Sequence, residues 1–220
     1  MCMRELPLKI GTHGTHWVTS VVSCVEIGVR LRQGREVSYS CQEVLDFYTP
    51  NKDDANYNDY ISGNGDGKIR DAAEFIKNYG LAKERDSPFV GFRENPPRLM
   101  HPIREKPLLD YRSIISPKDR EVESELKNRP IVAVFNVESS FDTETDGWKN
   151  VYRPPTHVED MYGHPMVLTG CGTTELSSNR KFWKCYNTTK RGVDSGGTVL
   201  MLRDDSRNPI SEILVPEISS

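Results

Sequence analysis

The sequence predicts an α+β protein with two lobes, and three observations lead to this prediction. Helical periodicity dominates the first 80 residues, short strand-like runs dominate the second half, and a proline-rich stretch lies between them. Helices that precede strands in this way are typical of an α+β architecture. A chain of 220 residues can bury a sizeable core. We expect a helical lobe over residues 1–100 and a β-rich lobe over residues 101–220.

The first lobe is expected to hold helices over residues 14–32, 40–47 and 69–79. Apolar or small residues recur there at three- and four-residue spacing. Gly34 and Gly80 follow the first and third helices as stop signals. The hydroxyls of Thr12 and Thr15 are candidate caps for the first helix, and Ser40 is a candidate cap for the second.

The second lobe is expected to consist of strands and one charged helix. Residues 87–107 carry five prolines and no periodicity, which indicates the connection between the lobes. Apolar and β-branched runs at spacings that suit a barrel then predict strands. The predicted strands are 112–115, 131–137, 166–169, 181–186 and 198–202, with the helix near 119–128.

Composition excludes several classes of protein. The net charge is −3 and no basic stripe is present, so we expect no nucleic-acid partner. Apolar runs are too short to span a membrane, and residues 1–7 lack the apolar region of a secretory signal. Five cysteines without CxxC spacing favour free thiols, no disulfides and a cytoplasmic protein. The alternative is a lysosomal, vacuolar or secreted protein of which this chain is a mature fragment.

Three segments carry the candidate chemistry. Residues 10–20 read Ile-Gly-Thr-His-Gly-Thr-His-Trp-Val-Thr-Ser, residues 164–172 read His-Pro-Met-Val-Leu-Thr-Gly-Cys-Gly, and residues 182–187 read Phe-Trp-Lys-Cys-Tyr-Asn. In this order they resemble three segments of the papain-family cysteine peptidases, which hold the nucleophilic cysteine, the catalytic histidine and an orienting asparagine. Weaker similarity over residues 34–46, 63–76 and 187–201 extends the resemblance to nearly the whole chain.

The resemblance implies a papain-like two-lobe fold, with a helical left lobe, a β-barrel-like right lobe and the active-site cleft between them. It places His16 at the nucleophile position, on the helix of the left lobe, and His164 and Asn187 at the catalytic positions of the right lobe. Peptide cleavage in this family needs a thiolate, which an imidazole at position 16 does not supply. The sequence therefore predicts a divergent homologue, a pseudoprotease in which the catalytic Cys is replaced by His.

Other positions implied by the resemblance agree with a loss of peptidase function. Ile10 stands where the family has the glutamine that donates a hydrogen bond to the oxyanion. Thr189 and Val193 stand where two tryptophans shield the histidine, and His13, Phe47 and Gly63 replace half-cystines. The substrate edge of the cleft maps to Trp17, Gly65, Asp66, Gly67 and Gly163.

Several motifs have competing interpretations. His13, His16 and His164 offer three imidazoles, the number in some catalytic zinc sites, although their spacing is poor evidence for one. Residues 64–69 resemble part of an EF-hand loop, but Ala73 occupies the twelfth ligand position. We therefore expect no metal and no cofactor. Cys24 is expected to be a core residue rather than a substitute nucleophile.

Three functions remain open at this point. The first is a pseudoenzyme without cysteine-peptidase activity that binds a protein, a peptide or a small molecule in or near the cleft. The second is a non-peptidase enzyme that uses His16 and His164 as acid and base on a small molecule. The third is residual cysteine-type proteolysis. The sequence gives no indication of the oligomeric state.

Overall fold

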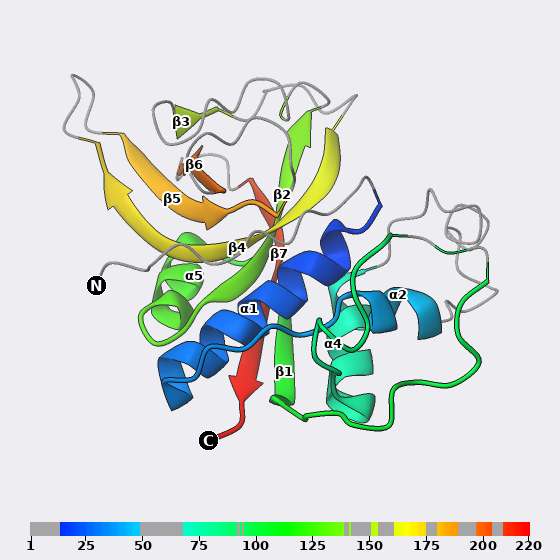
Figure 1. Cartoon of the computed structure of the whole chain (residues 1–220). Helices are drawn as coiled ribbons and strands as arrows, with labels where there is room; N and C mark the ends of the chain where they lie inside the picture. Colours follow the sequence, from blue (N-terminus) through cyan, green and yellow to red (C-terminus); the bar gives the residue numbers. More distant parts are fainter. Residues whose placement is uncertain are drawn as a thin grey trace. The chain divides into compact units, whose positions relative to one another are not determined.

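The computed structural model describes residues 14–48, 68–91, 93, 95–138, 141, 151–153, 161–174, 180–188, 197–203 and 209–220. These residues fall into two compact units, which Figure 1 shows in the colours of the sequence. The helical unit takes its described residues from Gly11–Arg112 and Leu214–Ser220, and the sheet unit takes its own from Ser113–Ile213. The lobe limits predicted from the sequence, 1–100 and 101–220, stay a prediction.

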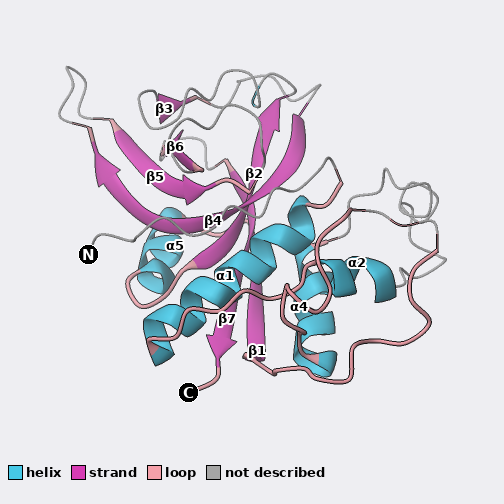
Figure 2. Ribbon diagram, in the orientation of Figure 1, coloured by secondary structure: helices cyan, strands magenta, loops and turns pink. Residues whose placement is uncertain are grey.

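The helical unit is built on α1 (His16–Gln33), α2 (Gln42–Phe47) and α4 (Ile69–Tyr79). All three predicted helices are confirmed, and Figure 2 shows them in cyan. α1 packs against α4, and its apolar side chains are buried except for Leu31 near its C-terminal end, which is 45% exposed. It ends at Gly34, whose φ of 68° lies in the left-handed region and whose N–H donates to the Arg30 carbonyl at 3.0 Å.

The predicted caps have different outcomes. Thr15 occupies the N-cap position of α1, but its hydroxyl makes no cap hydrogen bond, so that prediction is wrong. Its backbone has φ −111° and ψ 0°, instead of the extended conformation that aims an N-cap side chain at the first turn. Ser40 lies one residue before Cys41, the N-cap residue of α2, and its hydroxyl accepts a hydrogen bond from the Glu43 N–H in the first turn at 3.2 Å. Thr12 lies outside the described residues.

The described strands form one sheet in the order β1-β7-β2-β4-β5-β6-β3. Their bounds are β1 Leu108–Ile115, β2 Ile131–Glu138, β3 Val151–Tyr152, β4 Met161–Thr173, β5 Lys181–Tyr186, β6 Thr198–Leu202 and β7 Ile210–Ile218. β2, β4, β5 and β6 pair antiparallel in succession, and β3 pairs parallel with β6. α5 (Asp119–Leu126) packs against β4 through Val122, which is completely buried.

The predicted strands are all present, but the sequence missed β3 and β7 and shortened β1 and β4. β4 is the longest of the described strands, at 13 residues, and its register against β5 shifts between Leu168 and Gly170. Large apolar side chains on its buried face and on its neighbours form the core of the sheet unit, including Phe135, Leu168 and Trp183. None of the described helices has the length and apolarity needed to cross a membrane.

Candidate functional site

His164 and Asn187 form a buried polar pair in the sheet unit. Nε2 of His164 lies 3.1 Å from Oδ1 of Asn187, and each residue is 1% exposed. The strand register accounts for their meeting, because Val167 on β4 lies opposite Tyr186 on β5. Continuing that antiparallel register places Asn187 beside Met166, two residues from His164 on the same face of β4.

The hydrogen bond fixes the protonation pattern of the His164 ring. An amide oxygen only accepts, so Nε2 of His164 carries the proton that it donates to Asn187. In the neutral ring Nδ1 then holds the lone pair, which makes it the atom able to accept a proton. Asn187 is held in turn by its backbone N–H, which donates to the Gly197 carbonyl at 2.7 Å.

Gly197 is required by this geometry. Its φ is 79°, and a Cβ there would lie 2.8 Å from Cε2 of Tyr186 and 3.1 Å from the carbonyl oxygen of Asn187. A residue with a side chain would therefore be both strained and in collision at this point. The close approach of Gly197 keeps Asn187 facing His164.

Aromatic rings surround His164. The ring centre of Phe141 lies 5.0 Å from that of His164, and Tyr162 follows at 6.1 Å. Phe141 is completely buried and also packs edge-on against Tyr152 at 4.8 Å. Apolar surroundings strengthen the hydrogen bond to Asn187 by excluding competing water. The sequence analysis missed Phe141, since a single phenylalanine in a polar stretch gives no periodic signal.

The first residue of α1 is His16, in the helical unit, and it is 8% exposed. The helix start is fixed by Trp17, whose Nε1 donates to the Gly14 carbonyl at 3.0 Å and whose ring packs against Tyr48 at 5.1 Å. The N-terminal end of a helix carries partial positive charge and favours an anion such as a thiolate. An imidazole placed there gains nothing from the helix by becoming charged.

The remaining predicted site residues have separate outcomes. Gly163 lies on β4 opposite Asn136, and a Cβ there would approach Cγ1 of Val134 to 3.0 Å. The structure brings His164 and Asn187 together, while His16 and Trp17 belong to the helical unit. The joining of His16 with the buried pair therefore stays a prediction. Several predicted positions lie outside the described residues, namely Ile10, His13, Gly63, Gly65, Asp66, Gly67, Thr189 and Val193.

The four cysteines in the described ranges are free thiols. Cys24 and Cys185 are buried, and burial raises the pKa of both thiols. Cys24 lies eight residues beyond His16, about 12 Å along the helix. The exposed Cys171 lies seven residues beyond His164, roughly 23 Å along β4. Burial therefore disfavours the thiolate form of Cys24 and Cys185. Cys171, in turn, is too distant from His164 along the strand to act with it.

No metal-ligand cluster of three or more His, Cys, Asp or Glu side chains occurs among the residues that the structure describes. The histidine set considered for zinc includes His13, which lies outside them. The EF-hand-like segment 64–69 is described only at its last two residues, and Ile69 there begins α4. The structure therefore adds no support for a metal at either segment.

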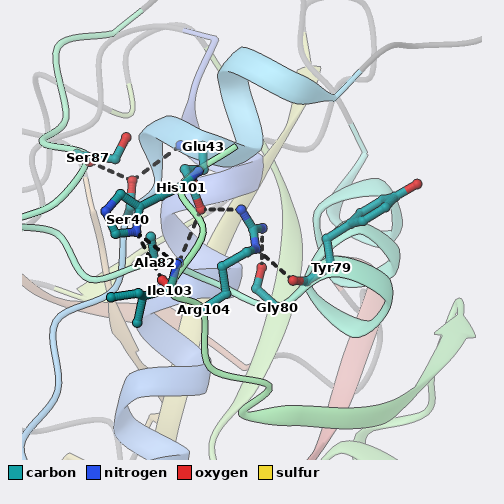
Figure 3. A network of polar contacts seen from close by, with 9 residues as sticks. All are labelled: Ser40, Glu43, Tyr79, Gly80, Ala82, Ser87, His101, Ile103 and Arg104. Carbon is teal, nitrogen blue, oxygen red and sulfur yellow. Dashed lines mark hydrogen bonds and ion pairs between the residues drawn. The ribbon is translucent and has the colours of Figure 1, made fainter. Parts of the chain in front are cut away.

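A buried carboxylate in the helical unit was missed by the sequence analysis (Figure 3). Glu43 is 1% exposed, and its Oε2 accepts from Arg104 Nη1 at 2.7 Å and from the Ala82 N–H at 3.1 Å. Its Oε1 accepts from the His101 N–H at 2.8 Å. Arg104 also donates to the carbonyls of Tyr79, at 2.7 Å, and Gly80, at 2.8 Å. Since both partners are saturated by the protein, this network has a structural role.

Comparisons with known proteins agree with this architecture. No family model matches the chain. Over 187 residues the chain is 26% identical to cathepsin 7 of Mus musculus, covering 81% of this chain and 51% of that protein. The chain thus spans about half the length of this curated relative.

Two solved structures are similar over nearly the whole chain. Bromelain protease from Ananas comosus, in complex with the E64 inhibitor, matches 97% of this chain and 94% of its own, with a TM-score of 0.73 and 19% identity. The proform of Amb a 11, a cysteine protease and ragweed pollen allergen, matches 98% and 63%, with a TM-score of 0.76 and 19% identity. The chain has the α+β fold of the papain-like cysteine proteases, which confirms the predicted fold class.

Proposed function

We propose that this chain is a papain-fold pseudoenzyme that does not cleave peptide bonds through a cysteine thiolate. We further propose that it binds a protein, a peptide or a small molecule in or near the region that corresponds to the peptidase cleft. The observation that carries the proposal is the identity of the residue that begins α1, which is His16. In the family that this chain resembles, the nucleophilic cysteine begins the equivalent helix.

Chemistry at that position supports the loss of peptidase function. A thiolate attacks an amide carbon readily, whereas an imidazole forms labile acyl adducts with activated esters and reacts poorly with amides. The thiols of Cys24 and Cys185 are held in their neutral form by burial, and Cys171 is too far along β4 to exchange a proton with His164. In addition, Ile10 at the oxyanion position supplies no side-chain donor, which typically costs about 100- to 1,000-fold in rate.

The retained pair supports a binding role. His164 and Asn187 keep a buried hydrogen bond and an aromatic surround. A buried polar pair of this kind orders the residues around it whether or not catalysis occurs. The free cysteines also support the proposal that the protein works in the cytoplasm, where thiols stay reduced. We propose neither nucleic acids nor membranes as partners.

A second candidate function has one observation in its favour. The bond from Nε2 of His164 to Asn187 leaves Nδ1 as the basic atom, as a general base requires. With His16 as the second imidazole, the protein would then act as a non-peptidase enzyme on a small molecule.

Covalent labelling tests the loss of thiolate chemistry. The protein is incubated with the E64 inhibitor and with unspecific peptide substrates, and adducts and cleavage are followed by mass spectrometry. We expect neither an adduct nor cleavage. The His16→Cys variant is expected to gain an adduct at residue 16 without efficient cleavage, and His16→Cys with Ile10→Gln is expected to cleave faster. Cleavage by the unmodified chain that His164→Ala abolishes would overturn the proposal in favour of residual proteolysis.

An activated ester separates binding from the second candidate. Hydrolysis of p-nitrophenyl acetate is measured for the unmodified chain and for His164→Gln at matched thermal stability. The binding role predicts the same slow rate for both proteins. A saturable rate that His164→Gln removes would instead support acid-base catalysis. Binding itself is measured with peptides selected from a displayed random library, and their affinity should fall in the His164→Gln variant.

A further inference from the structure

The sheet unit contains a polar pocket whose lining includes neither His164 nor Asn187. It has a volume of about 750 Å³ and lies where the start of α5 meets β2, β7 and the end of β6. The residues that matter for its chemistry are Ser116, Lys118, Arg120, Asn136 and Arg203. The proposed function does not use any of them.

Arg203 is the fixed element of this pocket. Its Nε donates to Oδ2 of Asp119 at 2.6 Å, its Nη1 donates to Oε1 of Glu123, and its guanidinium carbon lies 4.6 Å from the ring centre of Trp183. The side chain is 11% exposed. Two carboxylates and an aromatic ring therefore hold the guanidinium in one orientation. Within the described part of the chain, Nη2 of Arg203 has no acceptor, so its N–H groups stay available in the pocket.

The rest of the lining has more donors than acceptors. Lys118 and Arg120 are exposed, and neither side chain forms an ion pair with any residue that the structure describes. The side chains of Asn136 and Ser116 likewise make no hydrogen bond among the described residues. The nearby carboxylates are already used, because Asp119 and Glu123 bind Arg203. The backbone N–H of Lys118 donates to Oε2 of Glu121 at 2.7 Å, so this carboxylate also has a partner within the protein.

A ligand that matches this lining must offer several acceptor oxygens and negative charge. We propose that the pocket binds a phosphate or sulfate group carried by a small molecule. Such a group has three or four oxygens, which suits a fixed guanidinium, two further cations, an amide and a hydroxyl. The volume exceeds what one oxyanion fills, so the group belongs to a larger molecule. Ser116, at the rim, has a φ of 48°, a strained conformation that often occurs at ligand sites.

Titration with inorganic phosphate tests the proposal on the full chain. Amide shifts are followed by two-dimensional NMR at constant ionic strength. We expect saturable shifts at Ser116, Lys118, Arg120 and Asn136. Lys118→Gln with Arg120→Gln should weaken binding at least about ten-fold, because two charge-assisted contacts are lost. The matched control, Lys127→Gln with Lys184→Gln, removes two exposed charges of the same unit outside the pocket and should change affinity less than about two-fold.

The remaining outcomes decide the proposal in either direction. Saturable binding of sulfate at the same residues would support it, as would weaker binding of acetate, which has only two oxygens. Equal weakening in the pocket variant and in its control would show unspecific charge attraction and overturn it. Absence of saturation for phosphate, in a chain whose spectrum shows a folded protein, would also overturn it.

Discussion

Replacing Glu43 with alanine is expected to destabilise the helical unit severely. The substitution removes the carboxylate that binds Arg104 at 2.7 Å, where the two side chains are 2% and 13% exposed. It also leaves the N–H groups of Ala82 and His101 without their buried acceptor. Removing one partner of a buried ion pair typically lowers the free energy of unfolding by about 3–5 kcal/mol. The guanidinium, which keeps only its bonds to two carbonyls, is the main source of that cost.

Urea unfolding followed by circular dichroism measures this loss. With a slope of about 2 kcal/mol per molar urea, a loss of about 4 kcal/mol lowers the midpoint by about 2 M. Such a loss is a large share of a total stability of about 5–15 kcal/mol. Native-state amide exchange adds a local readout, because the amides of Ala82 and His101 should lose protection before those of α4 do.

Two further variants make the reasoning refutable. Asp110→Asn breaks the ion pair with Lys77, whose contact distance of 2.9 Å is close to the 2.7 Å of the buried pair. The side chains of Asp110 and Lys77 are 58% and 36% exposed, so this change should have little effect. Removing both buried charges, in Glu43→Gln with Arg104→Met, should cost less than the sum of the two single changes Glu43→Gln and Arg104→Met. If Glu43→Ala destabilised the chain no more than Asp110→Asn does, the buried network would not be a source of stability.

Two other predictions concern the helical unit. Gly80→Ala should cost about 2 kcal/mol or more in urea unfolding, because Gly80 has a φ of 76° and the new Cβ would lie 2.3 Å from the Glu105 carbonyl oxygen. Gly34→Ala, at a φ of 68° with no atom within 4 Å, should cost clearly less, and equal costs would contradict the argument. Burial raises the pKa of Asp46 above its ordinary value of 3.8, so the folded state binds more protons there than the unfolded state does. The free energy of unfolding therefore falls as the pH rises through the interval above 3.8. The Asp46→Asn variant should lack the contribution of Asp46 to this fall. If the pH profiles of stability were parallel for the two proteins, this assignment to Asp46 would be refuted.

Local signals were sufficient for most of the fold. The periodicity over residues 69–79 predicts α4 at its observed bounds, and β5 and β6 are also predicted at theirs. The two missed strands depend on distant partners instead. β3 is two residues long, and β7 contains Pro216, which lacks an N–H for pairing. Neither segment has a local pattern strong enough to identify it.

The candidate site shows the same division between local and distant information. His164 and Asn187 were found through motif resemblance, and the β4–β5 register explains their contact. Glu43 was interpreted only as an acidic residue at a helix start, because its partner Arg104 is 61 residues away in a proline-rich connection. A charged residue inside an otherwise buried helix was the signal that could have identified it.

The C-terminal residues have a consequence for how the chain matures on the ribosome. A Cβ at Gly28 would lie 2.7 Å from Cγ1 of Ile218, so Ile218 fills the notch that this glycine leaves on α1. Gln33 also donates to the Ser219 carbonyl at 2.9 Å. The helical unit, whose helices are translated first, therefore lacks this contact until Ile218 and Ser219 have been translated. Until then, a nascent chain carries α1 without the side chain that packs against Gly28.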